Sequence, residues 1–294
     1  MTIGSRVTNV LSRPDLYKET INQIFTELNR AWFRIIGPPE TTSVMEKKWD
    51  TLILLDCARY DYFSDFYEGE GHLTKRRTNS SHSSEFAQYE FAEDTFHDTV
   101  YVTGNPFIAK LDEDTFHKLI MVPTEMTDGG AYVSPETTAE LAKEAHENHP
   151  DKRIIVHFMQ PHEPYLGEVG RSMSMVNWGH SNYPQGDTTR KDLRAAYREN
   201  LEIVWESVEN LLNKVSGRIS VTADHGKLLG ERQQPIPVRG YSHMPGLYVP
   251  ELVDVPWLQL DGEPRSVTED QPGGIVNEDG ADEAKDRLKA LGYI

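Results

Sequence analysis

The chain has one cysteine and no long apolar run, and each shortage excludes a class of structure. Cys57 is the sole cysteine among 294 residues, so no disulfide can form within the chain and nothing marks an oxidising compartment. No apolar stretch is long enough to span a bilayer, and the first residues lack the apolar core of a signal peptide. We therefore expect no transmembrane span and a cytoplasmic location.

Positive charge is also scarce. Thirty Lys and Arg stand against 47 Asp and Glu, which gives a net charge of −17. An acidic surface repels the phosphate backbone, so no nucleic acid partner is expected. Such surfaces also stay soluble in strong salt, and a halophilic, haloarchaeal protein is one interpretation of this charge. The sequence contains no P-loop or Gly-x-Gly-x-x-Gly motif, so no motif of these two kinds indicates nucleotide binding.

Short apolar runs alternate with amphipathic stretches from Trp49 onward. This alternation predicts an α/β fold with a mainly parallel central sheet and helices on both faces. The length suits one such domain, and we place it at residues 48–294. The expected strands are 51–55, 99–103, 153–158 and 218–223, with weaker runs at 119–122 and 246–249, and the expected helices are 135–148 and 191–214.

Residues 1–47 form a separate N-terminal helical extension in this division. Apolar residues recur at spacings of three and four between 15 and 36, which predicts an amphipathic helix that ends at Gly37-Pro-Pro. Such a helix would ordinarily lie on the sheet, and the alternative is a helix that binds a membrane surface or a partner.

Several predicted strands end in residues that bind metals. Strand 51–55 runs into Asp56, and strand 218–223 runs into Asp224-His225-Gly226. Because the carboxyl ends of parallel strands collect ligand chemistry, these side chains are expected to meet. Two carboxylates and an imidazole suit a divalent cation, so Asp56, Asp224 and His225 are the predicted metal ligands.

Three further histidines lie near predicted strand ends. His157 and His162 occupy the end of the third strand, in a His-x-x-x-x-His-Glu-Pro-Tyr segment, and His243 precedes the apolar run 246–249. Histidines and carboxylates gathered from several loops are typical of a metal site or an acid–base site.

Together these segments resemble the alkaline-phosphatase/sulfatase superfamily. The resemblance rests on segments 54–61, 157–165 and 221–231 and on their order, and it covers the chain from about Trp49 onward. It implies that Asp56, Asp224 and His225 hold a metal that also holds the nucleophile. It further implies that His162 contacts the substrate oxyanion or leaving oxygen and that His243 is directed at the transferred group.

The resemblance also places a hydroxyl nucleophile in the serine-rich segment 80–84. Ser83 matches that position best, with Ser84 and Ser81 as close rivals. The sulfatase motif in which Cys or Ser is followed by x-Pro-x-Arg is missing, which argues against formylglycine catalysis. Cys57 follows Asp56 where sulfatases have a second carboxylate, so one metal is favoured over two.

The roles of two residues stay open at this point. Arg59 follows Asp56 by three residues and is expected either to bind the substrate anion or to pair with Asp61. His157 is expected either to contact substrate or to be buried in the core.

These features predict a metal-dependent hydrolase or transferase of sulfate or phosphate esters, with a metal-bound serine as nucleophile. The expected cofactor is Zn, Mn, Mg or Ca, and the expected partner is an anionic ester, either a small molecule or a glycan. One alternative is a phosphoglycerol- or phosphoethanolamine-type transferase that acts on an envelope glycan or lipid. The other is a catalytically degenerate, sulfatase-like binding protein.

Overall fold

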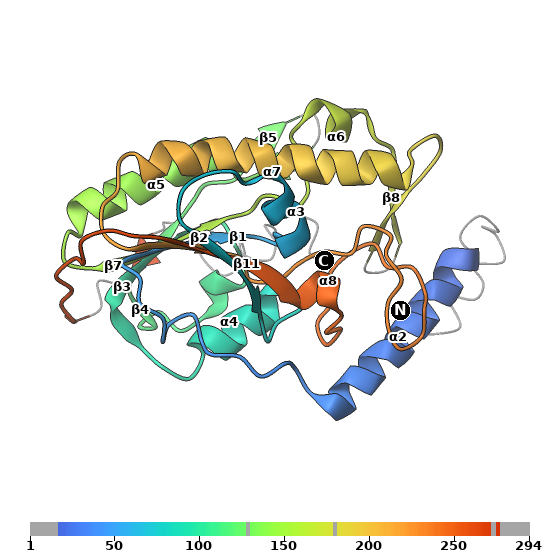
Figure 1. Ribbon diagram of the computed structural model, residues 1–294, viewed down its shortest axis with the longest axis horizontal. Coiled ribbons are helices and arrows are strands. Elements are labelled where there is room, and N and C mark those ends of the chain that lie inside the picture. Colours follow the sequence, from blue (N-terminus) through green and yellow to red (C-terminus); the bar gives the residue numbers. More distant parts are fainter. Residues whose placement is uncertain (1–16, 128–129, 179–180, 272–274, 277–294) are drawn as a thin grey trace.

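The computed structural model describes residues 17–127, 130–178, 181–271 and 275–276, and an α/β sheet organises them (Figure 1). The sheet has the strand order β12-β4-β3-β7-β1-β10-β11-β2. Its strands are β1 (Thr51–Leu55), β2 (His72–Arg77), β3 (Phe96–Thr103), β4 (Phe116–Met121), β7 (Arg153–Phe158), β10 (Ile219–Thr222), β11 (Asp254–Leu260) and β12 (Ile275–Val276). The strands from β12 to β10 pair in parallel, whereas β11 pairs antiparallel with both of its neighbours.

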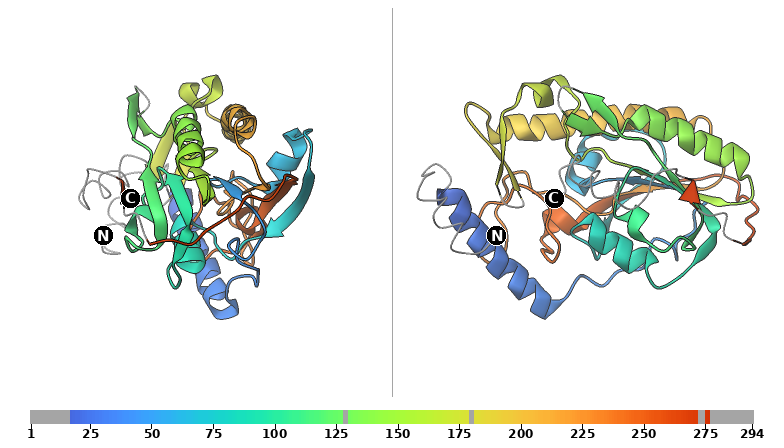
Figure 2. Two further views of the ribbon diagram at one scale, coloured as in Figure 1. Left: turned by 90° about the vertical axis from the view of Figure 1, so that its left-hand side faces the viewer. Right: turned by 180° about the vertical axis from the view of Figure 1, so that it is seen from behind.

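Helices cover both faces of this sheet, as the sequence predicted (Figure 1, Figure 2). Side chains alternate along β1, so Ile53 packs with the face covered by α5 and α7, and Leu54 packs with the face covered by α4. The helices are α2 (Tyr17–Ile36), α3 (Tyr60–Phe66), α4 (Ser83–Phe91), α5 (Pro135–Asn148), α6 (Glu168–Ser172), α7 (Arg190–Leu212) and α8 (Pro250–Val253), with a 3₁₀ turn η2 at Ile108–Lys110.

Two small hairpins stand outside the sheet. They are β5 (Glu125–Thr127) with β6 (Gly130–Tyr132), and β8 (Met175–Trp178) with β9 (Ser181–Pro184). Residues 246–249, a weak strand candidate, form no strand. Leu247 and Val249 instead pack with Leu252 of α8 in a small separate cluster.

Helix α2 forms where the sequence predicted a helix, but it does not lie on the sheet. It projects from the end of the molecule near α8, apart from the helices that cover the sheet (Figure 1, Figure 2). Within the described residues, no helix combines the length and the apolarity needed to cross a membrane.

Candidate active site

The sheet register places the two predicted carboxylate ligands opposite each other. Strands β1 and β10 are adjacent and parallel, with Leu54 paired to Thr222. Asp56 and Asp224 each lie two residues further along, just beyond the carboxyl ends of their strands. Two separate sequence segments therefore deliver their acidic side chains to one point.

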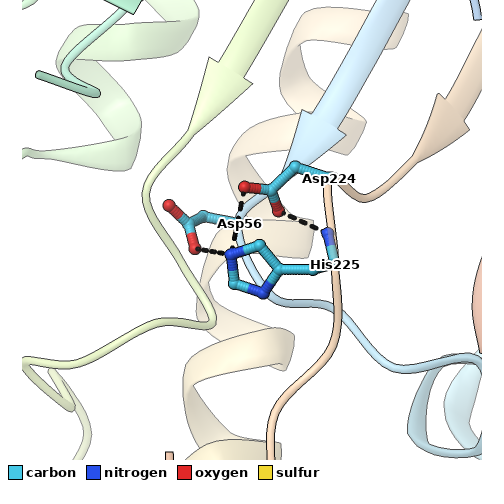
Figure 3. Close-up of side chains that lie close together, drawn as sticks. All are labelled: Asp56, Asp224 and His225. Atoms are coloured by element: carbon cyan, nitrogen blue, oxygen red, sulfur yellow. Dashed lines mark hydrogen bonds and ion pairs between the residues drawn. The ribbon is translucent and has the colours of Figure 1, made fainter. Parts of the chain in front are cut away.

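Asp56, Asp224 and His225 converge there and are fully buried (Figure 3). Each offers one potential ligand atom, and these atoms all lie within 4.8 Å of one another. The His225 Nε2 atom lies 3.3 Å from Asp224 Oδ2 and 3.9 Å from Asp56 Oδ1. Within the described part of the chain, this is the one group of three such residues that could hold a metal ion.

The backbone around the triad fixes the direction of each ligand. His225 Nδ1 donates to the Gly226 carbonyl oxygen at 2.8 Å, which leaves the Nε2 lone pair facing the two carboxylates. A Cβ atom on Gly226 would come within 2.2 Å of the Glu251 carbonyl oxygen, so only glycine fits at this turn. Asp224 Oδ1 accepts hydrogen bonds from the backbone N–H groups of Cys57 and His225, at 3.0 and 2.9 Å.

These contacts keep Asp224 ionised. Burial alone would raise its pKa, but His225, His157, the Cys57 N–H and the Ser83 hydroxyl lower it below the usual value. Two buried carboxylates require positive charge nearby. The donor set therefore fits a divalent cation of the kind that binds oxygen and nitrogen ligands.

Ser83 reaches all three residues of the triad. It is the first residue of α4, and its Oγ donates to Asp224 Oδ2 at 2.7 Å. The same atom lies 3.2 Å from His225 Nε2 and 3.4 Å from Asp56 Oδ2.

The rival serines point elsewhere. Ser84 Oγ bonds His82 Nδ1, and Ser81 Oγ donates to the Met244 carbonyl oxygen. The geometry therefore favours Ser83 among the three.

His162 and His243 form a buried pair beside the triad. Their Nε2 atoms lie 2.9 Å apart, and the His243 ring stacks on the His225 ring with centroids 4.5 Å apart. His162 Nδ1 donates to the Glu163 carbonyl oxygen, so the proton between the two rings belongs to His243.

The resting pair is neutral. Burial lowers the pKa of His162 to about 4 and the pKa of His243 well below its usual value.

The structure also positions the two residues whose roles were left open. His157 is fully buried: its Nδ1 contacts the Tyr101 hydroxyl at 3.0 Å, and its Nε2 lies 3.8 Å from Asp224 Oδ2. His157 thus lies beside the Asp224 carboxylate in the interior. This position is better suited to supporting that carboxylate than to contacting substrate. Arg59 forms a two-point ion pair with Asp61 and a second with Glu231, at 3.0 Å, so its guanidinium serves the ion-pair role.

Three further residues of the site were not identified from the sequence. His82 caps α4 by accepting from the Ser84 N–H, and its ring lies 4.9 Å from that of His243. Asn105 donates to Asp56 Oδ2 at 3.2 Å. Its place just beyond the end of β3 is the strand-end signal that identified Asp56, so it could have been found.

The third is Lys227, which directly follows the Asp224-His225-Gly226 turn. Its buried ammonium pairs with Glu163, the neighbour of His162. Burial would lower the pKa of Lys227, but Glu163 raises it above the usual value. Lys227 thus remains a fixed positive charge that ties the turn after β10 to the loop after β7.

Neither a protein-family model nor a curated protein sequence matches the chain. Solved structures do. The soluble domain of lipooligosaccharide phosphoethanolamine transferase A from Neisseria meningitidis is 12% identical with a TM-score of 0.47, over 71% of this chain and 75% of that one. A putative sulfatase from Bacteroides thetaiotaomicron is 12% identical with a TM-score of 0.46, over 76% and 66%.

An alkaline phosphatase superfamily protein from Vibrio parahaemolyticus is 16% identical with a TM-score of 0.41, over 85% of this chain and 71% of that one. The solved structures to which this chain is similar thus include a phosphoethanolamine transferase, a putative sulfatase and an alkaline phosphatase superfamily protein.

Proposed function

We propose that the protein is a metal-dependent enzyme that hydrolyses phosphate or sulfate esters, or transfers their phosphoryl or sulfuryl group, with Ser83 as nucleophile. One observation carries this proposal. A buried hydroxyl at the start of a helix lies within 3.4 Å of a side-chain atom of each of the three candidate metal ligands. A structural serine cap would not require two carboxylates and an imidazole around its oxygen.

Asp56, Asp224 and His225 would hold the cation, which when bound would lower the pKa of a nearby hydroxyl and offset charge on the ester oxygens. With its pKa lowered in this way, the Ser83 hydroxyl would lose its proton to solvent, and its Oγ, which lies 2.7 Å from Asp224 Oδ2, then attacks phosphorus or sulfur. One Oγ bond to the central atom forms as the bond to the leaving oxygen breaks. The positive end of α4 favours the anionic group beside Ser83.

His162 and His243 would orient the group and serve the leaving oxygen. At rest the two ring N–H groups are held by the Glu163 carbonyl oxygen and by the partner ring, so the anionic ester would have to draw one further proton from solvent onto the pair. The protonated pair would then donate to the non-bridging oxygens and give that proton to the leaving oxygen. Water or an alcohol then attacks the serine ester and releases Ser83. With water as the acceptor the protein would be a hydrolase, and with an alcohol it would be a transferase.

A panel of esters tests the proposed reaction. We expect protein supplied with Zn, Mn, Mg or Ca to release p-nitrophenol from the phosphate monoester, the phosphate diester or the sulfate ester, and a chelator to stop the release. Turnover that increases with added alcohol would identify a transferase. Metal binding without turnover of any ester in the panel would contradict the enzyme assignment and favour a catalytically degenerate binding protein.

Replacement of either histidine of the pair should slow the reaction without removing the metal. We expect His162→Ala and His243→Ala to lower turnover by on the order of 10²-fold on alkyl esters, because a positioned donor is lost. The loss should be smaller on p-nitrophenyl esters, whose leaving oxygen needs less protonation. His72→Ala, an exposed histidine on β2, is the matched control. If a variant of the pair loses its metal outright, that histidine is a ligand and the assigned role is wrong.

A further inference from the structure

Helix α2 has the inverse of the usual orientation of an amphipathic helix. Most of its large apolar residues face outward: Ile24 is 57% exposed, Leu28 51% and Ile35 83%, whereas Phe33 packs against Tyr248. In contrast, the polar residues Thr26 and Asn29 are buried against the rest of the protein. The exposed apolar stripe of α2 consists of Tyr17, Ile24, Phe25, Leu28, Trp32, Ile35 and Ile36.

Specific hydrogen bonds hold the helix in this orientation. Asn29 Nδ2 donates to Gln233 Oε1 and to the Ile236 carbonyl oxygen, and its Oδ1 accepts from the Ile236 N–H at 2.8 Å. On the same side, Arg30 Nε donates to the Pro245 carbonyl oxygen at 2.7 Å. Asn29 and Arg30 already have hydrogen-bond partners in the rest of the protein. Rotation of the helix to bury its apolar stripe would therefore break several hydrogen bonds.

The stripe extends along most of the helix. From Ile24 to Ile36 its members recur at spacings of three and four, and Tyr17 lies two turns before Ile24 on the same face. Helix α2 as a whole has 20 residues, which corresponds to about 30 Å. A contiguous apolar surface of this kind marks an interaction site. It also carries Trp32 and Tyr17, aromatic residues of the type that settle at a lipid–water interface.

Charge indicates what covers the stripe. Residues 1–36 carry five Lys and Arg against three Asp and Glu, whereas the other residues carry 25 against 44. Lys18 and Arg34 are exposed on α2 itself. The basic segment therefore complements an anionic surface that would repel the rest of the protein.

We propose that α2 binds the surface of an anionic lipid bilayer, with its apolar stripe in the headgroup region and Lys18 and Arg34 near the lipid phosphates. The opposite side of α2 is bonded to the loop that carries His243, so docking would hold the candidate site close to the lipid surface. Vesicle binding by α2 does not depend on the chemistry at Ser83, and the two can fail separately.

Co-sedimentation of the full chain with lipid vesicles tests this proposal. We expect binding to vesicles that contain phosphatidylglycerol and weaker binding to phosphatidylcholine alone. Leu28→Ser/Ile35→Ser should reduce vesicle affinity by on the order of tenfold or more, because two exposed apolar side chains are lost. Lys18→Gln/Arg34→Gln should reduce the preference for the anionic lipid by a similar factor.

A matched control removes exposed apolar side chains elsewhere. Tyr89→Ser/Met126→Ser replaces two large residues that are 48% and 76% exposed outside α2, and it should bind vesicles as the wild type does. Equal losses in the control and the α2 variant, or no binding to either vesicle, would overturn the proposal. Sedimentation velocity without lipid adds a third test: a dimer that Leu28→Ser/Ile35→Ser dissociates, together with no vesicle binding, would assign the stripe to self-association instead.

Discussion

The Ser83→Ala variant should lose turnover by at least about 10³-fold while its metal affinity stays within about tenfold of the wild type. The hydroxyl that lies 2.7 Å from Asp224 Oδ2 is removed, and no other serine of the segment takes its place. The candidate ligands are unchanged, and a neutral hydroxyl contributes little to metal affinity beside two carboxylates. Steady-state rates on the best ester of the panel and calorimetry with the metal measure the two quantities.

The neighbouring serines supply the controls for this prediction. Ser84 bonds the capping His82, and Ser81 bonds a backbone carbonyl, so Ser84→Ala and Ser81→Ala should retain most of the turnover. Full activity in Ser83→Ala with a loss in Ser84→Ala or Ser81→Ala would move the nucleophile but keep the mechanism. Full activity in all three variants would exclude a covalent serine intermediate.

The convergence of Asp56 and Asp224 was predictable because it depends on a rule of parallel sheets. Buried parallel strands read as continuous apolar runs, and their carboxyl ends meet at one edge. Thr51–Leu55 and Ile219–Thr222 are runs of this kind, and their register brings Asp56 and Asp224 together without further information.

Other parts of the fold depend on contacts that no local pattern reports. Strand β2 is largely polar, and β11 carries Pro256 in its middle, so neither resembles a buried strand. The run 246–249 resembles a strand but packs as a small cluster beneath α8 instead. The same limit applies to α2. Its periodicity predicts one apolar and one polar face, but it does not predict which face contacts the rest of the protein. That choice follows from hydrogen bonds between Asn29 and a loop more than 200 residues away.

The pairing of His162 with His243 is a further case. Each lies near a predicted strand end, which made convergence foreseeable. The direct ring contact and the neutral resting state follow from complete burial, and burial is a property of the folded chain. His82 has no strand-end signal, because it acts as a helix cap within a serine-rich turn.

Removal of the Asp224 charge should strongly weaken metal binding while the fold is retained. In Asp224→Asn the amide oxygen can still accept from the Cys57 and His225 N–H groups, which preserves the turn after β10. The ionised oxygen that faces His225 Nε2 and Ser83 is lost. We expect metal affinity to fall by at least about 10²-fold, measured by calorimetry with Zn, Mn, Mg and Ca and by elemental analysis.

Thermal unfolding with and without metal distinguishes this loss from misfolding. A ligand at 100 times its Kd stabilises the folded state by about 2.7 kcal/mol, so the wild type should unfold at a higher temperature with metal and Asp224→Asn should not. Asp50→Asn is the matched control, because Asp50 is also buried but pairs with Arg218 at the opposite ends of the same strands. That variant should be less stable than the wild type but keep its metal-dependent shift, since the triad is untouched. If the wild type binds none of the four cations, or if Asp224→Asn keeps the wild-type affinity, the triad of Asp56, Asp224 and His225 is not a metal centre.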